Sequence, residues 1–164
     1  MNMVIRKATN EDIPEISRLA SEIWWAVYPD IITNEQIEFM LDKMYSASSL
    51  LQQLESGHQF YIAEENNEPV GYYSFSEKVT GKYFLHKLYI KTNAHRKGSG
   101  RMLVNHLVNS LPSKSELRLT VNRRNYKAIN FYFKNRFVIE EVADFDIGNG
   151  FFMEDFVMLR MPNK

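Results

Sequence analysis

The sequence contains no cysteine, which excludes disulfides, thiolate metal sites and a cysteine acyl-enzyme. Glycine and proline are scarce, with seven and five residues among 164, so collagen-like and low-complexity architectures are excluded as well. Neither sign of charge is in excess, because 20 basic side chains balance 20 acidic ones. A balanced chain has no overall field that attracts nucleic acid or an anionic membrane, and we expect neither as a partner.

Long hydrophobic runs are also missing. No stretch approaches the roughly 18 apolar residues of a membrane span, and the first residues lack the apolar core of a signal peptide. We therefore expect a cytoplasmic protein. The chain does contain 45% hydrophobic and 13% aromatic residues, enough to fill a core, and we expect a single domain over residues 1–164.

Hydrophobic periodicity predicts a mixed α/β order. Helical spacing follows the capping residues Thr9 and Thr33, continues over 46–54, and returns over 98–111 and 125–135. Alternating patterns predict strands over residues 3–8, 60–63, 69–75, 82–90, 116–121, 137–147 and 151–161. The single crossover helix between the fourth and fifth strands implies one parallel strand pair in an otherwise antiparallel sheet.

The segment after the strand over 82–90 carries the most chemical information. That strand ends in Leu88-Tyr89-Ile90, and a basic turn, His95-Arg96-Lys97-Gly98-Ser99-Gly100-Arg101, opens the next helix. Two glycines at a helix start let the backbone approach a ligand closely, and the unpaired amides there favour an anion such as a pyrophosphate. The basic side chains of the turn can add contacts to phosphate oxygens. An ordinary basic loop in front of a helix is the alternative interpretation.

Other phosphate-binding or catalytic loops do not match this spacing. A dinucleotide fingerprint needs a third glycine where Leu103 stands, and the Gly-Lys-Ser/Thr of a P-loop is absent. Ser99 lacks the spacer residues that a nucleophile elbow requires. A dehydrogenase, a kinase and a serine hydrolase are therefore disfavoured.

A second motif lies about thirty residues downstream, as Asn125-Tyr126-Lys127-Ala128-Ile129-Asn130-Phe131-Tyr132 followed by Arg136-Phe137. In their order and spacing the two motifs resemble those of the GNAT (Gcn5-related) N-acetyltransferases, over nearly the whole chain. Two positions depart from the family pattern. His95 stands where an Arg or Gln is usual, and Arg136 replaces the glycine that usually ends the helix.

The resemblance implies a GNAT-type α/β fold, with a mixed, mostly antiparallel central sheet of about seven strands, helices on both faces, and one parallel strand pair splayed at the cofactor site. It implies acetyl-coenzyme A as the cofactor, held by residues 95–101 and Asn125. It further implies that the backbone around Leu88, Tyr89 and Ile90 pairs with the pantetheine arm like an added strand. Tyr132 is then both a cofactor contact and the proton donor to the leaving thiolate.

Without a cysteine, the simplest reaction is direct attack of an amine on the thioester in a ternary complex. An amine with a pKa of roughly 10.4 must first lose a proton. His86 is the candidate base, because it precedes Leu88 on a strand where many relatives carry a catalytic Glu. The alternative is a half-buried histidine without a catalytic role. His58 and His106 have no partner at ligand spacing, and we expect no metal.

Acceptor specificity is expected to come from the first helices. Glu22, Trp25 and Tyr28 combine a carboxylate with aromatic faces and suit a small cationic amine, whereas Trp24 is expected in the core. The layout of this region resembles bacterial polyamine acetyltransferases. A protein or peptide amine as acceptor, and an acyl-CoA-binding sensor module without turnover, stay open as alternatives. The Phe-rich strands over 137–147 and 151–161 can pair between chains, which makes a homodimer an option.

Overall fold

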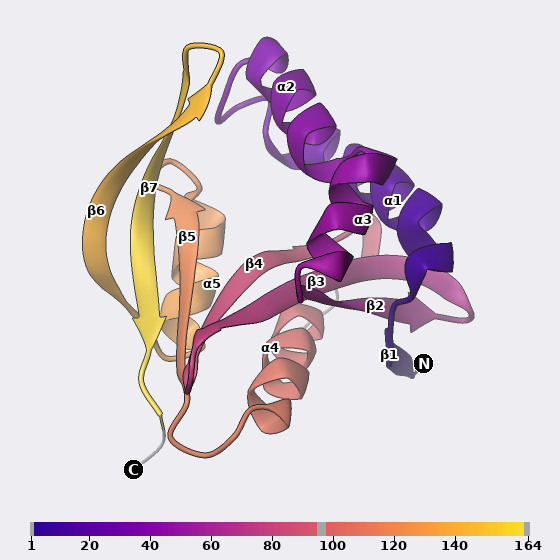
Figure 1. Cartoon of the computed structure of the whole chain (residues 1–164), viewed down its shortest axis with the longest axis vertical. Coiled ribbons are helices and arrows are strands. Elements are labelled where there is room, and N and C mark those ends of the chain that lie inside the picture. The colour runs from indigo at the N-terminus through magenta and orange to yellow at the C-terminus, as the bar shows by residue number, and fades with distance from the viewer. Residues whose placement is uncertain (1, 95–97, 163–164) are drawn as a thin grey trace.

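The computed structural model describes residues 2–94 and 98–162. Seven strands form one sheet in the order β1-β2-β3-β4-β5-β7-β6, and every neighbouring pair is antiparallel except β4 and β5. The predicted mixed sheet with one parallel pair is therefore confirmed (Figure 1). The elements are β1 (Met3–Lys7), η1 (Asn10–Asp12), α1 (Ile13–Val27), α2 (Asn34–Tyr45), α3 (Ala47–Glu55), β2 (Gln59–Glu65), β3 (Glu68–Val79), β4 (Lys82–Ile90), η2 (Thr92–Ala94), α4 (Ser99–Ser110), β5 (Glu116–Asn122), α5 (Tyr126–Lys134), β6 (Phe137–Gly148) and β7 (Phe151–Arg160).

Side-chain caps mark the starts of two helices in the first third, and the predicted cap Thr33 is one of them, whereas the predicted cap Thr9 precedes the short η1 and α1 begins only at Ile13. Before α2, the Thr33 hydroxyl accepts a hydrogen bond from the Gln36 amide at 3.2 Å. Before α3, the Ser46 hydroxyl accepts one from the Ser49 amide at 3.3 Å. These side chains satisfy amides that have no acceptor within their own helix, which fixes the residue at which each helix starts. None of the helices in the described part of the chain is long and apolar enough to cross a bilayer.

Helices cover both faces of the sheet, and each face has its own core. The bundle of α1, α2 and α3 packs on one face of the first strands, around buried residues such as Ile23, Ile37 and Tyr72. On the other face α4 and α5 pack against a second cluster that includes Leu103 and Leu119. Figure 1 shows the three N-terminal helices on one side of the sheet and α4 below it. The cluster on the α4 and α5 face includes residues of both β4 and β5, such as Leu85 and Leu119, so it joins the two strands where they are still paired.

The divergence of β4 and β5 is the feature that creates a site. Their ladder runs only from the Lys82–Glu116 pair to the Leu85–Leu119 pair, although β4 continues to Ile90 and β5 to Asn122. Figure 1 shows the two strands separating beyond the paired segment. The predicted splay of the parallel pair is thus present, and it leaves a gap in the middle of the sheet that side chains line.

A bulge changes which side chains of β4 point into this gap. Ser74 of β3 pairs with Lys87, whereas the next residue, Phe75, pairs with Leu85. His86 is therefore the extra residue, and the alternation of faces shifts by one position at this point. Leu85 packs in the α4-side core, while Lys87, two residues later, does not.

The β6–β7 hairpin closes the far end of the gap by docking on α2. Gln36 donates a hydrogen bond from Nε2 to the Phe152 carbonyl at 2.9 Å, and Lys43 donates to the Ile147 carbonyl. The rings of Phe39 and Phe151 lie 5.2 Å apart. Figure 1 shows the tip of the hairpin reaching the outer end of α2. These contacts join the two halves of the molecule at a second place.

The end of α5 provides a test of backbone strain. Arg136, which follows the C-cap Asn135, has φ = 71°, a left-handed conformation that costs a non-glycine residue about 1–2 kcal/mol. We expect Arg136→Gly to raise the free energy of unfolding by about 1 kcal/mol over Arg136→Ala, since both remove the side chain and only the first removes Cβ. Chemical denaturation measures the difference, and equal stability of the two variants would contradict this account.

Candidate functional site

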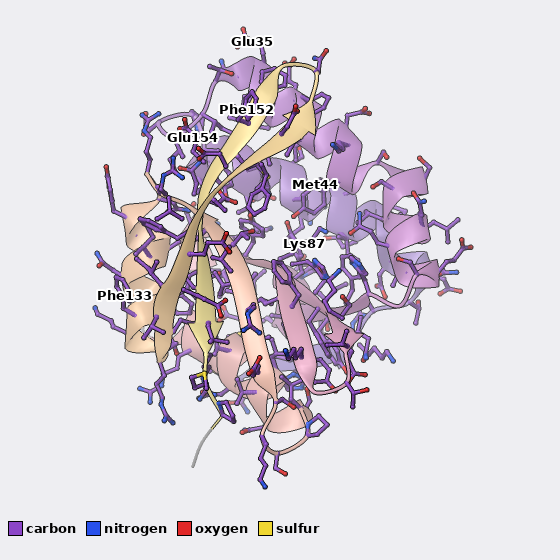
Figure 2. All side chains as sticks on the ribbon, turned by 60° about the vertical axis from the view of Figure 1, so that its left-hand side comes forward. Glu35, Met44, Lys87, Phe133, Phe152 and Glu154 are labelled. Carbon is purple, nitrogen blue, oxygen red and sulfur yellow. The ribbon has the colours of Figure 1, made fainter. Side chains whose placement is uncertain are left out.

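A cavity of about 610 Å³ lies where β4 and β5 separate. Its wall is formed by α1, α2, β4, the start of α4, β5, α5 and β7. Figure 2 labels Met44 and Lys87, which reach this cavity from α2 and β4. The volume is in the range of small-molecule sites, and the wall is contributed by segments that are far apart in the chain. The site is therefore a product of the tertiary fold.

The start of α4 borders one end of the cavity. Gly98 has φ = 96° as the N-cap residue, a conformation that glycine adopts without strain. The amides of the next residues have no acceptor inside the helix and favour an anion. Gly98, Ser99, Gly100 and Arg101, which the sequence analysis expected to contact the cofactor, all line the cavity. The predictions for His95, Arg96 and Lys97 lie outside the described residues.

Gly100 also joins the two sequence motifs physically. A Cβ atom at this position would lie 2.8 Å from Cε2 of Phe131, so the aromatic ring of α5 packs directly on the glycine. Any larger side chain would require the ring of Phe131 to shift. Lys127 and Lys134 of α5 line the same cavity and, with Arg101, add positive charge to its wall. The sequence analysis did not single out these two lysines.

The predicted strand Leu88-Tyr89-Ile90 lines the cavity opposite α5. It lies beyond the last β4–β5 pair, so this stretch of β4 faces the gap and not β5. Side chains from β5 and α5, including Val121 and Ala128, make the neighbouring wall apolar. An extended, uncharged chain with an anionic end therefore fits the groove from β4 to the start of α4.

Tyr132 and Asn125 occupy the two ends of α5. Tyr132 lines the cavity and is 8% exposed. Burial raises its pKa well above the usual value, so its hydroxyl keeps its proton at neutral pH. The side chain of Asn125 accepts a hydrogen bond from the Ala128 amide at 3.3 Å and caps the helix while lining the cavity. Asn125 therefore sets where α5 begins.

Tyrosine hydroxyls gather around the deep part of the cavity. Tyr28 and Tyr89 are hydrogen-bonded through their hydroxyls at 2.9 Å, and Tyr72 donates to the Tyr45 hydroxyl at 2.8 Å. Burial raises the pKa of Tyr28 to about 12. Tyr28, Tyr45 and Tyr89 line the cavity together with Trp24, which is 2% exposed and confirmed as a core residue. The result is a neutral, aromatic pocket floor.

His86 lines the cavity from the bulge of β4. Its Nε2 is hydrogen-bonded to the Ser76 hydroxyl at 2.7 Å, and its ring stacks on His58 with centroids 4.0 Å apart. Burial and the nearby positive charges of His58 and two lysines lower its pKa to about 3. The ring is therefore neutral at pH 7 and able to accept a proton, although it holds one weakly.

Lys87 is a buried cation beside His86, and the sequence analysis did not foresee it. Its Nζ donates to the Gln53 side chain at 2.6 Å and lies 5.3 Å from the ring centre of Tyr45. Burial lowers its pKa to about 8. The bulge turns this residue inward, and strand alternation in the sequence does not reveal a bulge.

Two predicted acceptor residues lie away from the cavity. Glu22 pairs with Arg18 at 3.3 Å and with Lys91 at 3.4 Å on the surface of α1, and it is not among the lining residues. Trp25 is 37% exposed and does not line the cavity either. Of the three predicted acceptor residues, the structure brings only Tyr28 to the site.

Asp155 is the acidic residue at this site, and the sequence analysis missed it. It lies on β7 opposite Asn122 of β5, is 0% exposed and lines the cavity. Neither carboxylate oxygen accepts a hydrogen bond from a described residue. Burial raises its pKa to about 6, although the nearby Thr120 hydroxyl and Arg123 guanidinium oppose this. A charged residue within the hydrophobic stretch of the last strand is the signal that could have found it.

The sequence matches the Acetyltransferase (GNAT) family over residues 18–136. The chain belongs to this family. Membership identifies it as an N-acetyltransferase that uses acetyl-coenzyme A. The groove fits this donor, because the apolar wall beside β4 suits the pantetheine arm and the start of α4 suits the phosphates.

Named relatives cover almost the whole chain. The spermidine N(1)-acetyltransferase of Thermoplasma acidophilum is 29% identical over 161 residues, which are 94% of this chain and 97% of that protein. The probable N-acetyltransferase Rv2775 of Mycobacterium tuberculosis is 27% identical over 85% of this chain and 82% of its own. The crystal structure of PaiA N-acetyltransferase from Thermoplasma acidophilum in complex with coenzyme A has a TM-score of 0.79 at 27% identity, covering 98% and 99% of the two chains. The GNAT fold thus extends along the full chain.

Proposed function

We propose that this GNAT enzyme transfers the acetyl group of acetyl-coenzyme A to a small cationic amine, such as a polyamine, by direct attack in a ternary complex. The observation that carries the proposal is the aromatic part of the cavity, which is continuous with the predicted donor groove. Aromatic faces attract a cation, and Tyr28, Trp24 and Tyr89 supply them here. The similarity to a spermidine acetyltransferase supports the same acceptor class.

Two links between segments that border the cavity favour a small acceptor over a protein or peptide amine. Arg124 donates hydrogen bonds to the Ile31 and Asp30 carbonyls at 2.8 and 3.4 Å, which ties the segment after α1 to the start of α5. Gln36 closes the other side through its bond to the Phe152 carbonyl. An extended peptide needs an open groove, which these two links obstruct.

Each group of residues has a separate role in the proposed reaction. The amides of residues 98–101, with Arg101 and Asn125, hold the donor, and the backbone of Leu88 and Ile90 pairs with its pantetheine arm. Acetyl-coenzyme A supplies the acetyl thioester. Tyr132 donates its hydroxyl proton to the leaving sulfur, for which its raised pKa keeps it protonated. His86, neutral at pH 7, is the proposed base that takes the proton of the amine.

Free thiol release tests the function. We expect the protein, mixed with acetyl-coenzyme A and a panel of polyamines, amino acids, aminoglycosides and peptides, to release thiol most rapidly with the polyamines. Preference for peptides would favour the alternative acceptor. Tight binding of acetyl-coenzyme A without thiol release from any amine would favour a sensor module. An unchanged pH profile of His86→Ala in the same assay would remove this residue as the base.

Homodimer formation and a cytoplasmic location remain part of the proposal. The edge strand β6 exposes several apolar side chains, among them Val138, Val142 and Phe145, which are 55%, 63% and 39% exposed. A second copy of the chain would cover them by pairing along this edge. A sedimentation mass equal to one chain would refute the dimer.

A further inference from the structure

We propose that the carboxylate of Asp155 binds the ammonium group of the acceptor amine. This inference rests on the proposed function and names the residue that recognises the acceptor's charge. It concerns a wall of the cavity, β7, to which the sequence analysis assigned no part of the site.

The first argument is the cost of the unsatisfied carboxylate. Asp155 is 0% exposed, and neither carboxylate oxygen has a hydrogen-bond donor within 3.5 Å and in good geometry among the described residues. The Thr120 hydroxyl lies near enough to lower the pKa of Asp155, but it does not offset the effect of burial. A buried charge without a partner opposes folding strongly. Its retention in the fold is explained if a cationic ligand supplies the missing partner during function.

The nearest cation does not meet this need. Arg123 donates from Nη1 to the Asp144 carboxylate at 2.8 Å and to the Ala143 and Asp155 carbonyls at 3.3 Å each. Its hydrogen bonds therefore go to another carboxylate and to the backbone. Two other polar side chains lie near the carboxylate. The Thr120 hydroxyl on β5 lowers the pKa of Asp155, and the charge of Asp155 adds to the raised pKa of Tyr28, which is due mainly to burial.

The second argument is the charge distribution of the cavity. Among the described residues that line it, Asp155 is the one carboxylate, whereas the positively charged or ionisable basic side chains are His86, Lys87, Arg101, Lys127 and Lys134. A cationic acceptor is repelled by the charged lysines and arginine and attracted to this single negative group, which in a buried site acts with little screening. The wall is not acidic overall, so the recognition depends on one residue.

The third argument is position. Asp155 lies on the β5–β7 side of the gap, opposite the β4 wall, and Tyr28 and Tyr132 line the same cavity. Burial raises the pKa of Tyr28, and the negative charge of Asp155 adds to this shift, which indicates that the carboxylate lies near the Tyr28 hydroxyl. Both carboxylate oxygens are covered in the structure, so neighbouring side chains must shift before an ammonium group reaches them.

The experiment compares Asp155→Asn with Glu154→Gln, which removes an exposed carboxylate from the adjacent position of the same strand. With spermidine as acceptor, we expect Asp155→Asn to raise KM for the amine about 10- to 100-fold, the worth of a charged hydrogen bond. KM for acetyl-coenzyme A stays unchanged, and Glu154→Gln behaves like the wild-type protein. An unchanged KM for spermidine in Asp155→Asn overturns the inference while leaving the proposed function intact.

Binding and stability give readouts that do not depend on turnover. Calorimetric binding of spermidine to the wild-type protein should weaken as pH falls through about 6, where Asp155 takes up a proton.

The pKa of Asp155 in the folded protein is above the unfolded value of 3.8. The native state therefore binds more protons than the unfolded state between pH 3.8 and about 6, and the free energy of unfolding falls as pH rises through this range. Asp155→Asn should therefore melt at a higher temperature than wild type at pH 7. A lower melting temperature, or binding equally tight at pH 5 and 7.5, would identify the carboxylate as structural.

Discussion

Tyr132→Phe should lower kcat about 100-fold at saturating substrates, within the range attributed to a positioned general acid. The leaving thiolate of a free thiol has a pKa of about 8.5, and a negative charge on sulfur is still less favourable in a buried site. Tyr132 is 8% exposed, and its hydroxyl remains protonated because burial raises its pKa. Phenylalanine keeps the packing of the ring and removes the proton, so KM for both substrates should change little.

A matched control lies on the same helix. Tyr126 is 69% exposed, six residues before Tyr132, and does not line the cavity. Tyr126→Phe removes a hydroxyl from the same helix without touching the proposed site and should retain wild-type turnover. Steady-state thiol release at saturating concentrations of both substrates measures the effect. Full turnover by Tyr132→Phe would remove this residue as the proton donor.

Gly71→Ala should be strongly destabilising, by about 1–3 kcal/mol, and should also raise KM for acetyl-coenzyme A. A Cβ atom at Gly71 would lie 2.6 Å from the backbone carbonyl oxygen of Tyr89 and 3.0 Å from Cγ1 of Ile90. Backbone atoms of a paired strand cannot turn aside as a side chain can. The end of β4 must therefore shift, and it is the segment proposed to pair with the pantetheine arm.

Gly100→Ala serves as the comparison for this prediction. Its added Cβ meets the ring of Phe131 at 2.8 Å, and a side chain can give way more readily than a carbonyl. We expect Gly100→Ala to lose less stability than Gly71→Ala in chemical denaturation, while still impairing the donor site. A Gly71→Ala protein as stable as wild type would show that β3 and β4 have more freedom than their register indicates.

Local patterns in the sequence were sufficient for most of the secondary structure. The strand predicted over 82–90 has those bounds in the structure, and Thr33, proposed as a cap, accepts a hydrogen bond from the Gln36 amide at the start of α2. Caps and strand alternation depend on residues a few positions apart, so the sequence displays them directly. The parallel β4–β5 pair followed from the single crossover helix between these strands.

Local sequence patterns predicted the acceptor side of the site less well. Helical spacing placed Glu22 and Trp25 near Tyr28, but α1 turns the first two away from the cavity. The bulge between Ser74 and Phe75 brought His86 and Lys87 together at the wall, and one extra residue in a strand leaves no regular mark in the sequence. These positions depend on how elements pack on one another.

The residues of the candidate site fall into the same two groups, those that the sequence identified and those that only the fold brought together. By itself, the sequence determined the family, the glycines at the start of α4 and the motif that ends in Tyr132, because each is a pattern of neighbouring residues. The tertiary structure alone decided that Asp155 shares a cavity with Tyr28 and Tyr132. These residues come from β7, the segment after α1, and α5, and only the separation of β4 from β5 allows them to meet.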